Sequence, residues 1–193
     1  DIIHSDDTHA YFITTLNDKK GLIAPDKTEV LPLAYDDISA LRVYNRFRER
    51  IPIRFQATLN GKTGIIDSIG GIILPFEFDY IKMNYEDNLE ATKGDETGVY
   101  DFYGKVLVEP RRGALRAYPN NVFVNNYKGV YAFVDSTNEY LDTFRYDYLS
   151  QLSSNFFETK KHNLYGMRDS LGQNLFEPKY SKIKDYNGVF GAA

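Results

Sequence analysis

A short segment that recurs five times constrains the fold of this 193-residue chain more than any other feature. Each copy contains a small residue followed by two mostly apolar residues, and the small residues are Gly21, Gly64, Gly98, Ala132 and Gly166. Successive copies are 43, 34, 34 and 34 residues apart. Such a period indicates one small structural unit repeated along the chain, because each unit buries its apolar face only against its neighbours.

Each copy is predicted to form three β-strands joined by two tight turns. The turn before the small residue carries residues that tolerate a positive φ, such as Asn60-Gly61. After the small residue, four copies have an Asp three residues before Gly or Asn: Asp67, Asp101, Asp135 and Asp169. This spacing is typical of type I turns, so we interpret these carboxylates as turn residues and not as general acids or bases. A recurrent Pro in the third strand predicts a strand end or a sheet edge.

The last copy shows the order of the recurring residues. It reads Tyr165-Gly166-Met167-Arg168-Asp169, then Leu175-Phe176-Glu177-Pro178, then Tyr180-Ser181-Lys182-Ile183. This order resembles the WG repeat, also called the KWG repeat, of bacterial β-rich repeat proteins, and the resemblance extends over about residues 10–185. In the other copies the Trp of the family motif is replaced by Lys20, Thr63, Thr97 and Tyr131. The resemblance implies a repeated β architecture that binds other molecules and does not catalyse a reaction.

We therefore predict an all-β fold of about five repeats of about 34 residues, with three strands each, stacked as an open β-hairpin solenoid or curved sheet. A five-bladed β-propeller is the alternative, although propeller blades usually need about 40 to 45 residues. Residues 1–9 are expected to form an N-terminal tail and residues 10–193 a single repeat domain. The repeats are expected at residues 10–38, 53–81, 88–115, 121–149 and 155–183.

Composition excludes several classes of protein. The absence of Cys excludes disulfides, thiol catalysis and Cys-ligated metal sites. No run of about 18 apolar residues exists, so no membrane span is expected. The formal net charge of -4 argues against a nucleic-acid partner. Because no catalytic motif accompanies the repeats, we expect neither an enzyme nor a cofactor.

Two groups of titratable residues are the alternatives to that expectation. Glu77, Asp79, Glu86 and Asp87 form the acidic cluster that an unrecognised enzyme would use. The tail has two His beside Asp6 and Asp7, a ligand set that suits a divalent ion. We expect a polar terminus without metal there, because chain termini are commonly unstructured.

Three departures from the repeat pattern supply the candidate partner-binding residues, since a copy released from the common packing task can serve a binding surface. The first is a nine-residue extension between the first two copies, with Arg42, Tyr44, Arg46, Phe47, Arg48 and Arg50. The second is the Arg111-Arg112 pair, and the third comprises Tyr118, Asn120 and Tyr127. Arg and Tyr are common interface anchors. The alternatives are a solvated loop for the extension and ordinary strand packing for the tyrosines.

The sequence thus predicts a non-catalytic module that binds a protein partner. By analogy with where such repeats occur, the concrete role is a bacterial immunity or inhibitor protein that neutralises a toxin. An acidic chain would attract a basic toxin domain. The alternative is a cell-envelope or carbohydrate-binding module that stacks exposed Tyr on sugar rings. We expect the bacterial cytoplasm, or the periplasm if a signal peptide preceded Asp1.

Overall fold

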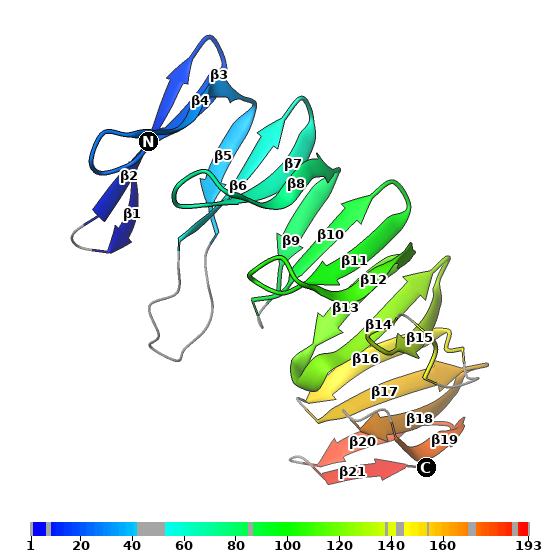
Figure 1. The fold of residues 1–193 in the computed structure, drawn as a ribbon. Coiled ribbons are helices and arrows are strands. Elements are labelled where there is room, and N and C mark those ends of the chain that lie inside the picture. The colour runs from blue at the N-terminus through cyan, green and yellow to red at the C-terminus, as the bar shows by residue number, and fades with distance from the viewer. Residues whose placement is uncertain are drawn as a thin grey trace. The chain divides into compact units, whose positions relative to one another are not determined.

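Antiparallel strands make up the fold in a computed structural model of the chain (Figure 1). The structure describes residues 2–6, 9–41, 53–84, 87–137, 139–141, 145–153, 155–169, 173–186 and 189–192. The chain divides into two compact units, Asp1–Gly94 with Tyr100–Lys105 and Asp95–Val99 with Val106–Ala193. The single repeat domain at residues 10–193 stays a prediction. The all-β prediction is confirmed, since the strands form several small antiparallel sheets. The choice between an open and a closed arrangement of the repeats stays a prediction.

The first unit contains two complete four-stranded sheets, each with its strands in sequence order. The first sheet consists of β1 (Ile2–Asp6), β2 (His9–Leu16), β3 (Lys19–Ile23) and β4 (Glu29–Tyr35). The second consists of β5 (Asp37–Ala40), β6 (Arg54–Leu59), β7 (Lys62–Asp67) and β8 (Ile72–Phe78). β9 (Tyr80–Met83) and β10 (Leu89–Lys93) then pair with each other in the same unit.

The second unit continues the pattern. β11 (Glu96–Tyr100) lies at the division between the units and is followed by β12 (Val106–Arg112). A three-stranded sheet contains β13 (Ala114–Tyr118), β14 (Val122–Tyr127) and β15 (Val130–Val134), with the 3-10 helix η1 (Pro119–Asn121) after β13. A four-stranded sheet contains β16 (Tyr148–Ser153), β17 (Phe156–Lys161), β18 (Leu164–Asp169) and β19 (Asn174–Tyr180). β20 (Ile183–Tyr186) pairs with β21 (Val189–Ala192).

In the first, second, third and fifth repeats, the predicted third strand is in fact two strands that belong to different sheets. β4 ends at Tyr35, and after Asp36 the chain continues as β5, which pairs with β6 in the next sheet. Complete sheets therefore have four strands and not three. Asp36 explains the break, because its carboxylate accepts a hydrogen bond from Lys19 Nζ in the first sheet (2.5 Å) and from Gly61 N in the second (2.9 Å).

The same arrangement fills the place where a tail was expected. Residues 2–6 form β1, which pairs with β2 as the outer strand of the first sheet. In the second sheet this outer position is taken by β5, a strand that follows directly from the preceding sheet. β1 therefore completes the first sheet, which has no earlier repeat to supply that strand.

The recurring glycine lies opposite a bulge in the last strand of the sheet. In the second sheet Thr63 pairs with Phe78 and Ile65 pairs with Leu74, so Gly64 faces a stretch with two extra residues. The first sheet and the sheet of β16 to β19 show the same shift in register. The recurrent Pro lies in this bulged strand, which is the last in sheet order, so the predicted edge position is confirmed.

Aromatic and aliphatic side chains between successive sheets form the core. In the first unit, Leu22 of the first sheet and Phe55 of the second are fully buried in one cluster. In the second unit, Phe133 and Phe157 meet edge to face with ring centroids 5.5 Å apart. Within the described residues, no helix is long and apolar enough to cross a membrane.

Candidate functional site

Arg111, one of the predicted binding residues, is part of a stacked cluster in the second unit. Its guanidinium carbon lies 4.1 Å from the ring centroid of Tyr140, and that of Arg145 lies 3.5 Å from the same centroid. The Tyr140 side chain keeps 39% of its surface exposed. We call these three residues the Arg–Tyr–Arg stack. Guanidinium groups bind aromatic faces, so the stack holds two cations in a fixed arrangement at the surface.

Sequence reasoning missed Tyr140 and Arg145, although the repeat contained a signal for the arginine. Arg111 and Arg145 are 34 residues apart and therefore occupy the same position in successive repeats. Lys179 occupies the same position one repeat after Arg145, and Glu77 occupies it one repeat before Arg111. Aligning the repeats by charge would have revealed that this position is basic in the last three copies.

The other candidates within the described residues lie in different surroundings. Arg112 is exposed, and its Nε lies 3.3 Å from Asp95 Oδ2. Tyr118 is half-buried and packs edge to face on Phe157, with centroids 5.1 Å apart, as the strand-packing alternative expected. Asn120 is exposed and has a positive φ of 64°. Tyr127 is exposed, with Lys128 Nζ 5.2 Å from its ring centroid.

The arginine-rich extension falls outside the described residues. Its six candidates are Arg42, Tyr44, Arg46, Phe47, Arg48 and Arg50. Glu86 of the acidic cluster is outside them as well, as are the side chains of the predicted tail. The binding role assigned to the extension stays a prediction.

The acidic residues that an enzyme would use have structural partners. Glu77 Oε2 accepts a hydrogen bond from Lys93 Nζ (2.8 Å). Asp79 repeats the role of Asp36, because it accepts from Lys62 Nζ (2.5 Å) and from Gly94 N (2.6 Å). Both bonds lower the pKa of Asp79 below its ordinary value of 3.8, and the bond from Lys62 has the larger effect. Among the described residues, no group of three or more His, Asp or Glu side chains is arranged to hold a metal ion.

The predicted turn role of the second-turn Asp residues is confirmed. Asp67 Oδ1 accepts hydrogen bonds from Ile69 N (3.0 Å) and Gly71 N (2.7 Å). Asp101 makes the same pair of bonds to Tyr103 N and Lys105 N, each 2.9 Å long. The carboxylates therefore hold backbone amides of the turn.

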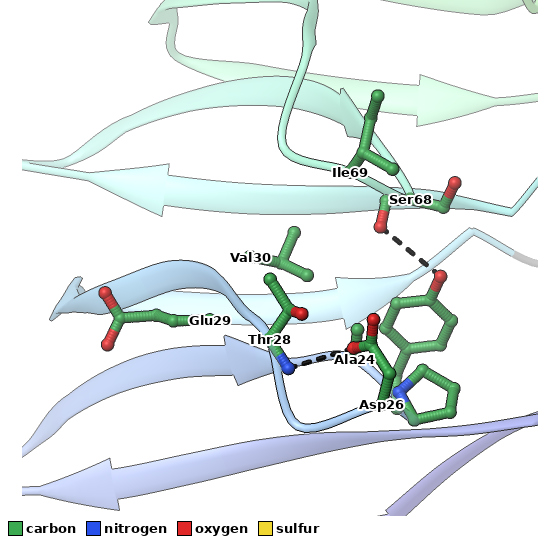
Figure 2. A pocket seen from close by; sticks show the side chains of 9 residues that line it. Ala24, Asp26, Thr28, Glu29, Val30, Ser68 and Ile69 are labelled. Atoms are coloured by element: carbon green, nitrogen blue, oxygen red, sulfur yellow. Dashed lines mark hydrogen bonds between the residues drawn. The ribbon is translucent and has the colours of Figure 1, made fainter.

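A pocket of about 320 Å³ opens in the first unit. Figure 2 shows Ser68 and Ile69 of the second sheet on one side and Ala24, Asp26, Thr28 and Val30 of the first sheet on the other. The remaining lining residues are Tyr11, Pro25 and Glu29. The Tyr11 hydroxyl donates a hydrogen bond of 3.3 Å to the backbone carbonyl oxygen of Ser68. The pocket thus has apolar walls and two carboxylates, with no basic residue in its lining.

The Asp26 carboxylate is held in place by a hydrogen bond within its own turn. Its Oδ1 accepts a hydrogen bond from Thr28 N at 2.9 Å. The Thr28 N–H and then the Thr28 hydroxyl hold the pKa of Asp26 below its ordinary value of 3.8. Asp26 is therefore ionised at neutral pH.

These features define a β-repeat protein with two candidate contact surfaces, the Arg–Tyr–Arg stack and the pocket. Residues 64–95 match the family model described as WG containing repeat. The resemblance predicted from the sequence is confirmed over this segment, and the match supports a repeat module with a binding role. No curated protein matches the sequence.

Several solved structures resemble the chain at low sequence identity. A eukaryotic initiation factor is 12% identical over 95% of this chain and 56% of its own, with a TM-score of 0.46. Hsv2 of Kluyveromyces lactis is 10% identical over 94% of this chain and 64% of its own, with a TM-score of 0.39. The WD40 domain of Neurospora crassa Pan2 is 12% identical over 92% and 64%, with a TM-score of 0.37. The chain spans 56 to 64% of the length of these proteins.

Proposed function

We propose that the chain is a non-catalytic protein-binding module, and more specifically a bacterial immunity or inhibitor protein that binds and neutralises a toxin in the cytoplasm. The Arg–Tyr–Arg stack is the observation that carries the binding role. It combines two residue types that commonly anchor protein interfaces, and both guanidiniums lie against the ring. Arg111 and Arg145 would therefore lose less side-chain freedom when a partner binds than mobile arginines would.

The repeat supports the same role. One repeat position is basic in three successive copies, at Arg111, Arg145 and Lys179, and a partner with a carboxylate-rich face would recognise these cations. Arg112, Asn120 and Tyr127 extend the proposed contact surface, since all three are exposed. Arg42, Tyr44, Arg46, Phe47, Arg48 and Arg50 remain proposed partner-binding residues from their sequence alone, and the half-buried Tyr118 stays a proposed one as well.

Affinity capture from lysate of the native bacterium tests the proposal, with the immobilised chain washed at low and then at high salt. Arg111→Ala with Arg145→Ala removes the cations of the stack. Arg116→Ala is the matched control, because Arg116 is an exposed arginine of β13 in the same unit. We expect one stoichiometric protein on the wild type and on the control, at least tenfold less on the double variant, and release by salt.

The inhibitor role needs a second measurement on the captured protein. Expression of the partner alone should arrest growth of a laboratory host, and co-expression of the chain should restore it. A partner without toxicity would leave the binding module intact and overturn the immunity role.

The carbohydrate-binding alternative rests on exposed tyrosines. Tyr103 exposes 65% of its side-chain surface and Tyr80 exposes 55%. Sugar rings stack on such faces, so a glycan ligand would change tyrosine fluorescence with little dependence on salt. Retention of cell-wall fragments in place of a protein would favour this function.

A further inference from the structure

The pocket of the first unit lies where the small Ser68 stands in place of a phenylalanine in the next repeat. Ser68 and Ile69 follow Gly64 by four and five residues, the positions that Phe102 and Tyr103 occupy after Gly98. Both pairs belong to the second turn of their repeat. Phe102 is only 8% exposed and packs beside the second sheet, whereas Ser68 leaves space beside the first sheet.

The side chain ten residues before the recurring glycine lies against the second turn of the next repeat, and the second repeat has an arginine there. Tyr11 stands ten residues before Gly21, and Arg54 stands ten residues before Gly64. The Arg54 side chain is only 8% exposed, and its guanidinium carbon lies 5.4 Å from the Phe102 ring centroid and 5.9 Å from that of Tyr103. The chain therefore already places an arginine against the second turn of the following repeat. In the first repeat Tyr11 takes that position and leaves a hollow beside its ring.

Charge also favours a cation in the hollow. The lining contains Asp26 and Glu29 and no Lys or Arg. Figure 2 shows the Asp26 carboxylate among the lining side chains, whereas the Glu29 carboxylate points away from them. The first unit contains 16 acidic and 12 basic residues, and the second contains 11 of each. The whole net charge of the chain thus belongs to the unit that holds the pocket.

We propose that this pocket binds an arginine side chain of the partner protein, with its methylene groups against Val30, Pro25 and Ile69 and its guanidinium at Asp26. Ile69 is 84% exposed, so a partner side chain would bury an apolar surface that water now covers. The inference rests on the proposed function, because it names one recognition element of the same partner.

The test uses small probes and the whole chain, so it needs no identified partner. Amide chemical shifts of the ¹⁵N-labelled chain are followed during titration with N-acetyl-arginine N-methylamide and, separately, N-acetyl-norleucine N-methylamide, which lacks the charge. We expect saturable shifts at Asp26, Thr28 and Ile69, with the arginine probe binding at least threefold more tightly.

Three variants separate the pocket from general attraction to an acidic protein. Asp26→Asn should weaken the arginine probe about threefold, and Glu29→Gln should change it less, although both remove one charge. Ser68→Phe introduces the residue of the next repeat and should abolish the shifts by filling the hollow. Equal binding of both probes, or equal effects of Asp26→Asn and Glu29→Gln, would overturn the proposal.

Failure of this inference is distinguishable from failure of the proposed function. Absence of saturable shifts with a partner still captured would reject the arginine site alone. Probe binding in a chain that captures no protein would reject the binding-module role and leave an arginine-binding pocket.

Discussion

At the scale of single residues, the recurring glycine is fixed by the bulge that faces it. A Cβ on Gly64 would lie 2.8 Å from the Leu74 carbonyl oxygen, and one on Gly166 would lie 2.6 Å from Pro178 N. Both contacts are with backbone that the bulge holds in place. We therefore expect Gly64→Val and Gly166→Val each to lower the free energy of unfolding by about 1 to 3 kcal/mol or to prevent folding, as measured by urea denaturation.

Gly94→Asn is the control for that prediction. Gly94 has a positive φ of 62° and no atom within 4 Å of an added Cβ, and Asn tolerates such a φ. Its denaturation midpoint should stay close to that of the wild type. Unchanged midpoints for both valine variants would contradict the close approach and with it the repeat register.

The lowered pKa values of Asp36 and Asp79 predict that the folded state loses stability in acid. Hydrogen bonds from Lys19 and Gly61 N lower the pKa of Asp36 below 3.8, and bonds from Lys62 and Gly94 N lower that of Asp79. A lowered pKa in the folded state contributes stability that is complete above the unfolded-state pKa and is lost as the pH falls through the folded-state value. Urea midpoints should therefore decline below about pH 4.

The double variant Asp36→Asn with Asp79→Asn isolates these two groups. It should be less stable than the wild type at pH 6 and should lose less of its remaining stability between about pH 4 and pH 2. Parallel pH profiles for the two proteins would show that other carboxylates cause the acid sensitivity.

At the scale of single elements, the second turn depends on its Asp. Asp67 Oδ1 holds two amides, and Asp101 Oδ1 holds the equivalent two in the next repeat. Asp67→Ala should lower the free energy of unfolding by about 1 to 2 kcal/mol, because both amides lose a charged acceptor. Glu77→Ala removes an exposed ion pair with Lys93 and should cost less than about 1 kcal/mol. Equal losses in thermal denaturation would count against the turn role.

The elements also show where sequence reasoning succeeds and where it fails. Hairpin turns such as Asn60-Gly61 and the edge position of the recurrent Pro follow from local rules on positive φ and on Pro in strands. The change of sheet at Asp36 was missed, although Tyr35 and Ile38 are both buried and lie three residues apart, which breaks the alternation of a single strand. The contacts of Asp36 with two different sheets then show where one strand ends and the next begins.

The candidate site was predicted less completely than the fold. Arg111 was identified as a break in the pattern, but Tyr140 was not, because an aromatic residue in a β-repeat usually packs in the core. The pocket had no local signal, since it arises from Ser68 being smaller than Phe102 one repeat later. Comparing equivalent positions between copies, in charge and in volume, would have found both features.

At the scale of the whole molecule, a repeat protein need not be equally stable along its length, since each repeat is stabilised mainly by its neighbours. β8 buries Leu74 and Phe78, which are 2% and 4% exposed, whereas none of the seven residues of β19 is buried. Phe176 and Tyr180 of β19 stack edge to face at 5.1 Å but stay half-buried.

Hydrogen exchange followed by mass spectrometry should detect this difference. Because exchange from a strand requires local opening, and opening of β19 exposes little buried apolar surface, its amides should exchange at least tenfold faster than those of β8 after correction for intrinsic rates. β17 provides the internal control, since Phe157 and Thr159 are 0% and 1% exposed and its amides should be protected like those of β8. Protection of β19 equal to that of β17 would mean that the second unit opens as one cooperative body, in which case the burial of individual strands does not set their stability.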